Sequence, residues 1–144
     1  MGRLIGIDYG AKRTGLAVTD PEQRIAGVLT TVLSYQLLEF LSQYIQKESI
    51  EGFVIGLPRR MNAQPSESAP LVKAFAKSLA KRFPDIPIHW MDERFTSTMA
   101  VQSMIMGGSK KSDRQKKENI DAVSAAIILE SFLQQEMIKK ERNS

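Results

Sequence analysis

Three carboxylates in this sequence stand among apolar residues, where an isolated charge is costly. Asp8 follows the apolar run 4–7, Glu93 follows the strand-like segment 88–92, and Asp121 lies inside the apolar stretch 120–129. A buried acid destabilises the fold unless a partner compensates its charge. Because the three acids belong to three different segments, one shared divalent cation is the simplest compensator. The pattern predicts a metal-dependent enzyme that acts on phosphate esters.

The chemistry of such an enzyme suits these residue types. Hydrolysis of a phosphodiester needs an activated water and a stabilised leaving oxygen, and two Mg²⁺ ions about 4 Å apart can supply both. Mg²⁺ takes hard oxygen ligands and keeps several waters, so a few carboxylates suffice. The chain has one histidine and no cysteine, which disfavours a zinc hydrolase.

Each acid alone also has a purely structural interpretation. An aspartate before a glycine-containing segment is often a turn residue, which fits Asp8. Glu93 could be a surface ion pair or a charge in the first turn of a helix. Asp121 could lie near a helix N-terminus, where negative charge is stabilising. The three acids together favour the metal site.

Basic residues cluster beside the same segments. Several precede the Asp121 helix within 107–118, a stretch that we predict to be a mobile loop able to close over a bound strand. These side chains could neutralise phosphates on either side of a cleavage point, the alternative being a solvated surface. The candidate nucleic-acid-binding residues are Lys12, Arg13, Arg59, Arg60, Arg94, Lys110, Lys111, Arg114, Lys116 and Lys117.

Hydrophobic periodicity predicts the elements that must position these residues. Three apolar segments separated by turns predict an antiparallel three-stranded meander, and later strands that alternate with helices predict parallel crossovers in a mixed sheet. His89 and Trp90 are expected to pack in the core. The predicted strands are 4–7, 16–19, 25–32, 52–57 and 86–91, and the predicted helices are 37–45, 71–83, a short one near 97–105, and 119–137.

Length and composition place limits on the class of protein. A chain of 144 residues with 42% hydrophobic and 25% charged residues is typical of one soluble globular domain. We expect a domain over 1–138 and a polar, frayed tail over 139–144. No apolar run approaches the roughly 20 residues of a membrane span, and no signal-peptide pattern is present. The absence of cysteine fits a cytoplasmic location, and the net charge of +4 favours a polyanionic partner.

Four sequence blocks, in order, resemble the signature motifs of the YqgF/RuvX family. The first is Gly6-Ile7-Asp8-Tyr9-Gly10, continued by 12–17, and the others are 56–58, 92–97 and 121–126. The resemblance implies an α/β, RNase H-like fold with a mixed five-stranded sheet, made of the meander plus two parallel strands and flanked by helices. It also implies that Asp8, Glu93 and Asp121 are catalytic acids that bind one or two Mg²⁺ or Mn²⁺ ions.

Members of that family are described as nucleases that mature the 5′ end of pre-16S rRNA or as Holliday junction resolvases. The leading hypothesis is therefore a metal-dependent endonuclease on structured RNA, a preference that rests on the resemblance alone, with branched DNA as the alternative substrate. Two other hypotheses remain open: a nucleic-acid-binding module without turnover, and an ATP-binding protein of the actin and sugar-kinase superfamily, which normally needs two domains. No membrane partner is expected, and both a monomer and a homodimer remain possible.

Overall fold

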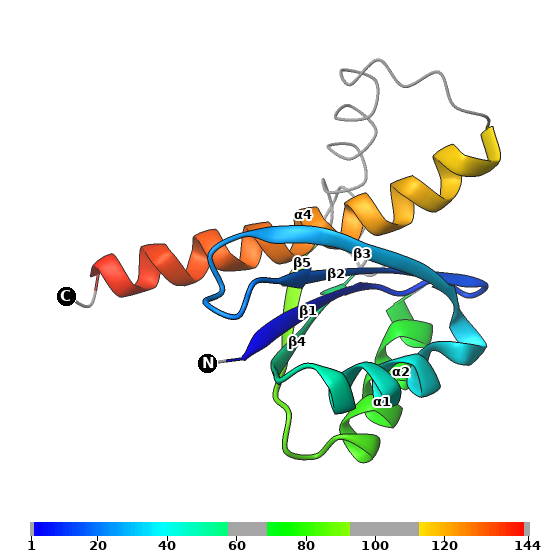
Figure 1. Ribbon diagram of the computed structural model, residues 1–144, viewed down its shortest axis with the longest axis horizontal. Helices are drawn as coiled ribbons and strands as arrows, with labels where there is room; N and C mark the ends of the chain where they lie inside the picture. The colour runs from blue at the N-terminus through cyan, green and yellow to red at the C-terminus, as the bar shows by residue number, and fades with distance from the viewer. Residues whose placement is uncertain (1, 58–68, 93–112, 143–144) are drawn as a thin grey trace.

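The computed structural model describes residues 2–57, 69–92 and 113–142 of the chain, with the side chains of 92, 113–120, 141 and 142 not described. The described residues form one mixed sheet with helices on both of its faces (Figure 1). The predicted segments 97–105 and 107–112 lie outside the described residues.

The sheet has five strands in the order β3-β2-β1-β4-β5. β1 pairs antiparallel with β2, and β2 pairs antiparallel with β3, which confirms the predicted meander. β4 lies parallel to β1, and β5 lies parallel to β4, as the crossovers required. The strands are β1 (Arg3–Asp8), β2 (Arg13–Thr19), β3 (Ala26–Leu33), β4 (Ile50–Leu57) and β5 (Ile88–Asp92).

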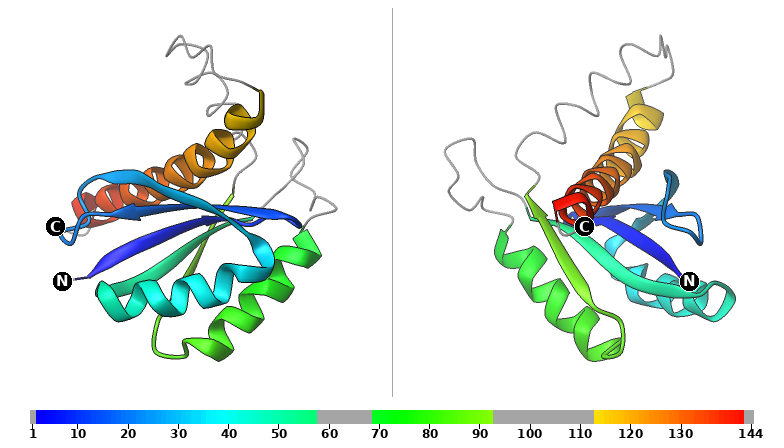
Figure 2. Two further views of the ribbon diagram at one scale, coloured as in Figure 1. Left: turned by 45° about the vertical axis from the view of Figure 1, so that its right-hand side comes forward. Right: turned by 90° about the vertical axis from the view of Figure 1, so that its left-hand side faces the viewer.

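Helices cover the two faces of this sheet unequally. The helices α1 (Leu37–Lys47), which the short 3-10 helix η1 (Ser34–Gln36) precedes, and α2 (Ala69–Arg82) lie on one face, and the long helix α4 (Asp113–Arg142) crosses the other (Figures 1 and 2). Because strand side chains alternate between faces, β1 contributes to two cores. Ile5 and Ile7 pack into the α1–α2 core, and Leu4 packs into the α4 core.

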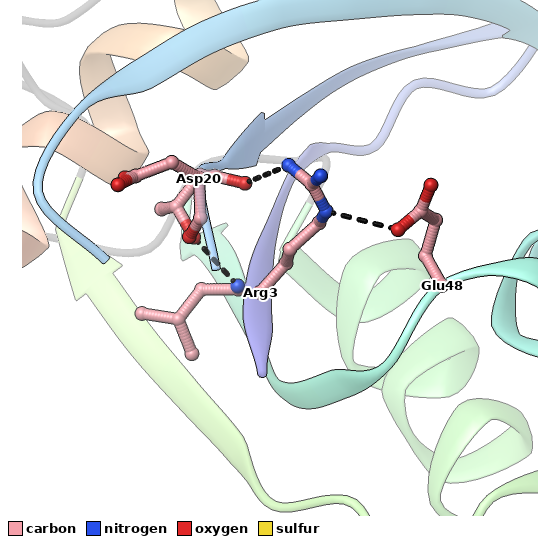
Figure 3. Close-up of polar contacts among 5 residues, drawn as sticks. Arg3, Asp20 and Glu48 are labelled. Atoms are coloured by element: carbon pink, nitrogen blue, oxygen red, sulfur yellow. Dashed lines mark hydrogen bonds and ion pairs between the residues drawn. The ribbon is translucent and has the colours of Figure 1, made fainter. Parts of the chain in front are cut away.

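The sheet is anchored at the end opposite Asp8 by a polar network around Arg3 (Figure 3). The Arg3 guanidinium donates to the Thr19 carbonyl at 3.0 Å and to the Glu48 carboxylate at 3.2 Å. The Leu4 amide donates to Thr19 Oγ1 at 2.9 Å. These bonds connect the start of β1 to the end of β2 and to the residues before β4, so they fix the register in which β1 carries Asp8.

Two helix boundaries predicted for α4 are wrong. The helix begins at Asp113 rather than near 119, so residues 113–118 are helical and not part of a loop. It also continues to Arg142, through most of the segment expected to be a frayed tail. The charged residues at both ends are good helix formers. Because these ends carry no apolar face, their sequence pattern does not distinguish a helix from a polar loop.

For β5, the prediction that His89 and Trp90 pack in the core is confirmed for His89 and wrong for Trp90. His89 is partly buried, with its ring centroid 4.9 Å from that of Phe132, and so it packs as expected. Trp90 does not, because 42% of its surface is exposed. β5 is the edge strand of the described sheet, so it has a neighbouring strand on one side only, and the Trp90 side chain is less enclosed than one in a central strand. Among the described residues, no helix is both long enough and apolar enough to cross a membrane.

Candidate active site

Asp8 is the last residue of β1, and its side chain is directed by strand pairing toward α4. In the antiparallel β1–β2 ladder, Asp8 lies opposite Gly15. Residues directly opposite each other project to the same face, with Cβ atoms about 4.5–5.5 Å apart. Since Gly15 faces α4, the partly buried Asp8 carboxylate is directed to the α4 face as well.

The main chain of Asp121 lies directly on Gly15. A Cβ atom added to Gly15 would stand 1.9 Å from the Asp121 carbonyl oxygen and 2.1 Å from its carbonyl carbon. No side chain fits there, so glycine is required for the helix to approach the sheet this closely. The contact places Asp121 beside the cross-strand partner of Asp8 and so brings two of the three predicted acids together.

A second glycine sets the direction in which α4 leaves this point. A Cβ atom on Gly6 would stand 2.8 Å from the carbonyl oxygen of Ala125 and 2.9 Å from the Leu129 Cβ. Ala125 lies one helical turn after Asp121, so α4 rests on β2 at one turn and on β1 at the next. Ala122 and Ala125 are buried there, and their small side chains permit the contact.

The position of Asp121 within α4 corrects one interpretation of its charge. α4 begins at Asp113, so Asp121 lies eight residues inside the helix. The favourable interaction of an acid with a helix N-terminus falls off within the first turn. The helix terminus therefore does not explain why an acid stands at this position.

Arg13 is a basic residue that lies close to Asp121. Its Nε lies 4.0 Å from Asp121 Oδ2, and both side chains are about one-third exposed, at 36% and 32%. An ion pair with this degree of solvent exposure and this large a separation between its charged atoms contributes little to stability. Arg13 belongs to β2 two residues before Gly15 and shares its face, so its cation lies at the rim of the acidic site.

The loop that joins Asp8 to Arg13 is held in place by Ser34, at the start of η1. The Ser34 amide donates to the Lys12 carbonyl at 2.8 Å, and the Ser34 hydroxyl donates to the Gly10 carbonyl. The same hydroxyl is 2.9 Å from Thr14 Oγ1, which is fully buried. These contacts hold the main chain of the loop that carries the exposed Lys12 between Asp8 and Arg13.

The donors present fit a hard divalent cation. The main chains of Asp8 and Asp121 both lie beside Gly15, and carboxylate oxygens are the ligand type that Mg²⁺ and Mn²⁺ prefer. The described residues contain no cluster of three His, Cys, Asp or Glu side chains, and Glu93 lies outside them. Glu93 does follow Asp92, the last residue of β5, and β5 runs parallel to β4 and β1, so the strands that precede Asp8 and Glu93 end at the same edge.

The remaining predicted binding residues divide into two groups. The backbone of Arg114, Lys116 and Lys117 lies in the first two turns of α4, and their side chains are not described. Arg59, Arg60, Arg94, Lys110 and Lys111 lie outside the described residues.

Two features of the site were not anticipated from the sequence. Gly6 and Gly15 determine where α4 crosses the sheet. The available signal was a glycine inside the first predicted strand and another directly before the second, which in the structure belongs to β2. Ser124 is also buried beside this contact, and its hydroxyl has no hydrogen-bond partner among the described residues. The sequence does indicate that Ser124 is buried, because Ser124 lies on the same helical face as several apolar residues.

A family model described as "RuvX: Holliday junction resolvase" matches residues 2–135 of the chain. This chain belongs to the RuvX family. The match covers nearly the whole length, which confirms the resemblance inferred from the four sequence blocks.

Curated relatives of this RuvX-family chain are similar over almost their full length. A protein from Bacteroides fragilis is 49% identical over 134 residues, which cover 93% of this chain and 97% of the relative. One from Porphyromonas gingivalis is 54% identical over 133 residues, with 92% and 96% covered. Both carry the name "Putative pre-16S rRNA nuclease".

Comparison with solved structures identifies the fold. RuvC from T. thermophilus, in complex with a Holliday junction substrate, superposes with a TM-score of 0.52 at 16% identity, covering 89% of this chain and 92% of that one. A second Thermus thermophilus RuvC structure gives 0.50 at 14% identity, with 88% and 91% covered. At this identity the likeness shows the fold alone, and it confirms the predicted RNase H-like architecture.

Proposed function

We propose that this RuvX-family protein is a metal-dependent endonuclease that hydrolyses phosphodiester bonds in the maturation of the 5′ end of pre-16S rRNA. The observation that supports the proposal most is the contact of the Asp121 main chain with Gly15, because Gly15 is the cross-strand partner of Asp8. The names of the relatives supply the substrate.

In this proposal Asp8, Asp121 and Glu93 hold one or two Mg²⁺ or Mn²⁺ ions. Bound ions of this kind lower the pKa of a coordinated water and stabilise the leaving oxygen. The fold holds the main chains of both acids in place, because Asp8 belongs to a central strand and Asp121 to a helix packed against two glycines. Lys12 and Arg13 lie at the rim of the site, where they would neutralise phosphates beside the scissile bond.

Structured RNA is the proposed substrate and branched DNA is the second candidate. The RNA proposal rests on relatives about half identical to this chain, whereas the DNA candidate rests on the description of the family model. A nuclease that makes one cut in rRNA needs one active site, so we propose that a monomer suffices, and that it acts in the cytoplasm. A resolvase would need two sites, as a symmetric dimer provides.

The test is a cleavage assay with two labelled substrates. The purified protein is incubated with precursor 16S rRNA that carries its 5′ extension and, separately, with a four-way DNA junction, each with Mg²⁺, Mn²⁺ or EDTA. The proposal predicts metal-dependent cleavage of the precursor at or near the mature 5′ end and no cleavage in EDTA. ATP hydrolysis, measured in parallel, should be absent.

Two results would overturn parts of the proposal. Symmetric cleavage of the junction with an intact rRNA precursor would assign the chain to the DNA candidate. Tight binding of either nucleic acid without cleavage under any metal would indicate a binding module, and the acids would then have another role.

A further inference from the structure

An apolar groove lies on the other face of the sheet, between α2 and the edge strand β5. Figure 2 shows the two elements side by side. The groove has a volume of about 510 Å³ and is lined by Leu57, Ala76, Ala80, Ile88 and Trp90 together with the exposed lysines Lys73 and Lys77. It is therefore large enough for a flat aromatic group and has two cationic side chains beside it.

Trp90 is the unusual member of this groove. It is the single tryptophan of the chain, and 42% of its surface is exposed. Isolated exposed apolar side chains are common on protein surfaces. Here, however, the indole forms part of an apolar groove, and an exposed indole beside cations is the usual platform on which a nucleic-acid base stacks.

The charge of α2 has one sign. Its sequence from Ala69 to Arg82 contains three lysines and one arginine and no acid. Lys73, Lys77 and Lys81 recur every four residues, so they follow one side of the helix. Arg82 pairs with Glu39 at 3.7 Å, whereas none of the three lysines forms an ion pair with another described residue. A stripe of like charges of this kind favours a polyanionic ligand.

The groove is close to the proposed active site. Trp90 pairs with Ile55 of β4, and Ile55 pairs with Ile7, the residue before Asp8. Two strand spacings amount to about 10 Å. Trp90 and Asp8 therefore both lie toward the carboxyl ends of the parallel strands, on opposite faces of the sheet. A single strand that contacts both would pass around the edge strand β5.

We propose that this groove binds the single-stranded RNA flank of the substrate. One base stacks on the Trp90 indole, and the adjacent phosphates pair with Lys73 and Lys77. This inference rests on the proposed function, because it extends the same substrate beyond the carboxylate site. It assigns a binding surface to a face of the molecule that the acids do not occupy.

Intrinsic fluorescence tests the stacking directly, because Trp90 is the sole tryptophan. An unstructured RNA of roughly ten nucleotides is titrated into the full-length protein in EDTA, so that cleavage cannot occur. Stacking should quench the emission in a saturable way. An abasic oligonucleotide of equal length and charge should quench far less, because it offers phosphates without a base.

Three variants separate stacking from charge. Trp90→Ala should weaken RNA binding, followed by anisotropy of a labelled RNA, by about 5- to 150-fold, and Trp90→Phe should recover most of the affinity. Lys73→Ala with Lys77→Ala should lower the salt slope by about 0.7 for each phosphate that is no longer neutralised. Lys139→Ala with Lys140→Ala, an exposed pair at the far end of α4, is the matched control and should change neither value.

A kinetic comparison ties the groove to cleavage and separates this inference from the proposed function. Wild-type protein should cleave a flanked RNA with a lower KM than the same RNA cut short on the side that leaves toward β5, and Trp90→Ala should remove that difference. Cleavage with equal KM for both RNAs, or RNA binding without quenching, would overturn the inference and leave the nuclease intact. Failure of the wild type to cleave any RNA would overturn the proposed function, while the titration would still decide whether the groove binds RNA.

Discussion

At the scale of single residues, the site depends on a glycine as much as on its acids. Asp8 and Asp121 are distant in the chain, and they are brought together because Gly15 has no side chain. The Arg13 guanidinium lies close to Asp121, but this exposed ion pair stabilises the fold little. We therefore expect Arg13 to act by contacting the substrate. The residue types were readable from the sequence, whereas their proximity depends on a contact between main chains.

Removal of one carboxylate charge should separate activity from stability. Asp8→Asn and Asp121→Asn should each lower kcat for RNA cleavage by more than about 100-fold, because losing even an indirect metal partner costs 10–100-fold. Thermal melts in EDTA should show an unchanged or higher Tm, since neighbouring carboxylates repel each other without metal. Glu130→Gln, on the exposed side of α4, is the control and should keep wild-type activity. Near wild-type cleavage by either site variant would remove that residue from the active site.

The turn between β2 and β3 supplies a pH-dependent prediction. Asp20 Oδ1 accepts hydrogen bonds from the amides of Arg24 and Ile25, and these bonds, that from Ile25 first, hold the Asp20 pKa below its usual range. A lowered pKa means that the ionised form stabilises the fold, fully above the pKa of the unfolded chain and progressively less as pH falls through the native value. Carboxyl NMR should show Asp20 titrating below the usual range of an aspartate side chain, and Asp20→Asn should remove the acid-side loss of stability. A midpoint within the usual range would contradict the assignment.

At the scale of elements, the position of Asp121 depends on how α4 crosses the sheet. The helix touches β2 at Gly15 and β1 at Gly6, and its buried face is built from small residues there and from Ile128, Leu129 and Phe132 farther along. This crossing holds Asp121 within a rigid helix, which suits a site whose ligands must not move.

A methyl group at Gly15 should disturb both fold and activity. Gly15→Ala would force its Cβ to within 1.9 Å of the Asp121 carbonyl oxygen, so α4 must shift. We expect destabilisation of about 1–3 kcal/mol or more, measured by urea unfolding, together with loss of cleavage. Gly27→Ala, in β3, meets no atom within 4 Å and is the matched control. If Gly15→Ala were as stable and active as Gly27→Ala, the described crossing would be wrong.

Much of the architecture was predictable from the sequence, and the failures have physical causes. Short apolar segments between turn residues indicated all five strands and their directions, because alternation and turn chemistry are local signals. The length of α4 was not predictable, since the charged segments 113–118 and 139–142 suit an exposed helix and a loop equally. The exposure of Trp90 depends on strand order, which periodicity does not encode. For the site, the acids could be named but the Gly15 contact could not, and the role of Glu93 stays a prediction.

At the scale of the whole molecule, the proposed active site and the proposed RNA-binding groove lie on opposite faces of the sheet. The α4 face carries Asp8 and Asp121, the α1–α2 face carries the groove with Trp90, and both lie toward the edge where β1, β4 and β5 end. The net charge of +4 suits a polyanion that contacts both faces.

The lysines that precede Asp121 should contribute to affinity in a salt-dependent way. Replacing Lys110, Lys111, Lys116 and Lys117 by Ala should weaken binding across sequences. The slope of log K against log salt concentration should fall by about 0.7–0.9 for each phosphate that these lysines neutralise. Anisotropy titrations at several salt concentrations measure both quantities. Unchanged affinity and slope would show that this segment is solvated surface and that binding lies elsewhere.

We propose that Asp8, Asp121 and Glu93 hold the metal ions with which this protein cleaves its substrate. The most direct measurement is a crystal structure of the protein with Mn²⁺ and a short RNA, in which anomalous scattering locates the ions. The account predicts one or two peaks with carboxylate oxygens of Asp8, Asp121 and Glu93 on the order of 2 Å away and a phosphate of the RNA in the same coordination sphere. RNA bound at this edge without a Mn²⁺ peak beside Asp8 and Asp121, or Mn²⁺ bound at other residues, would contradict it.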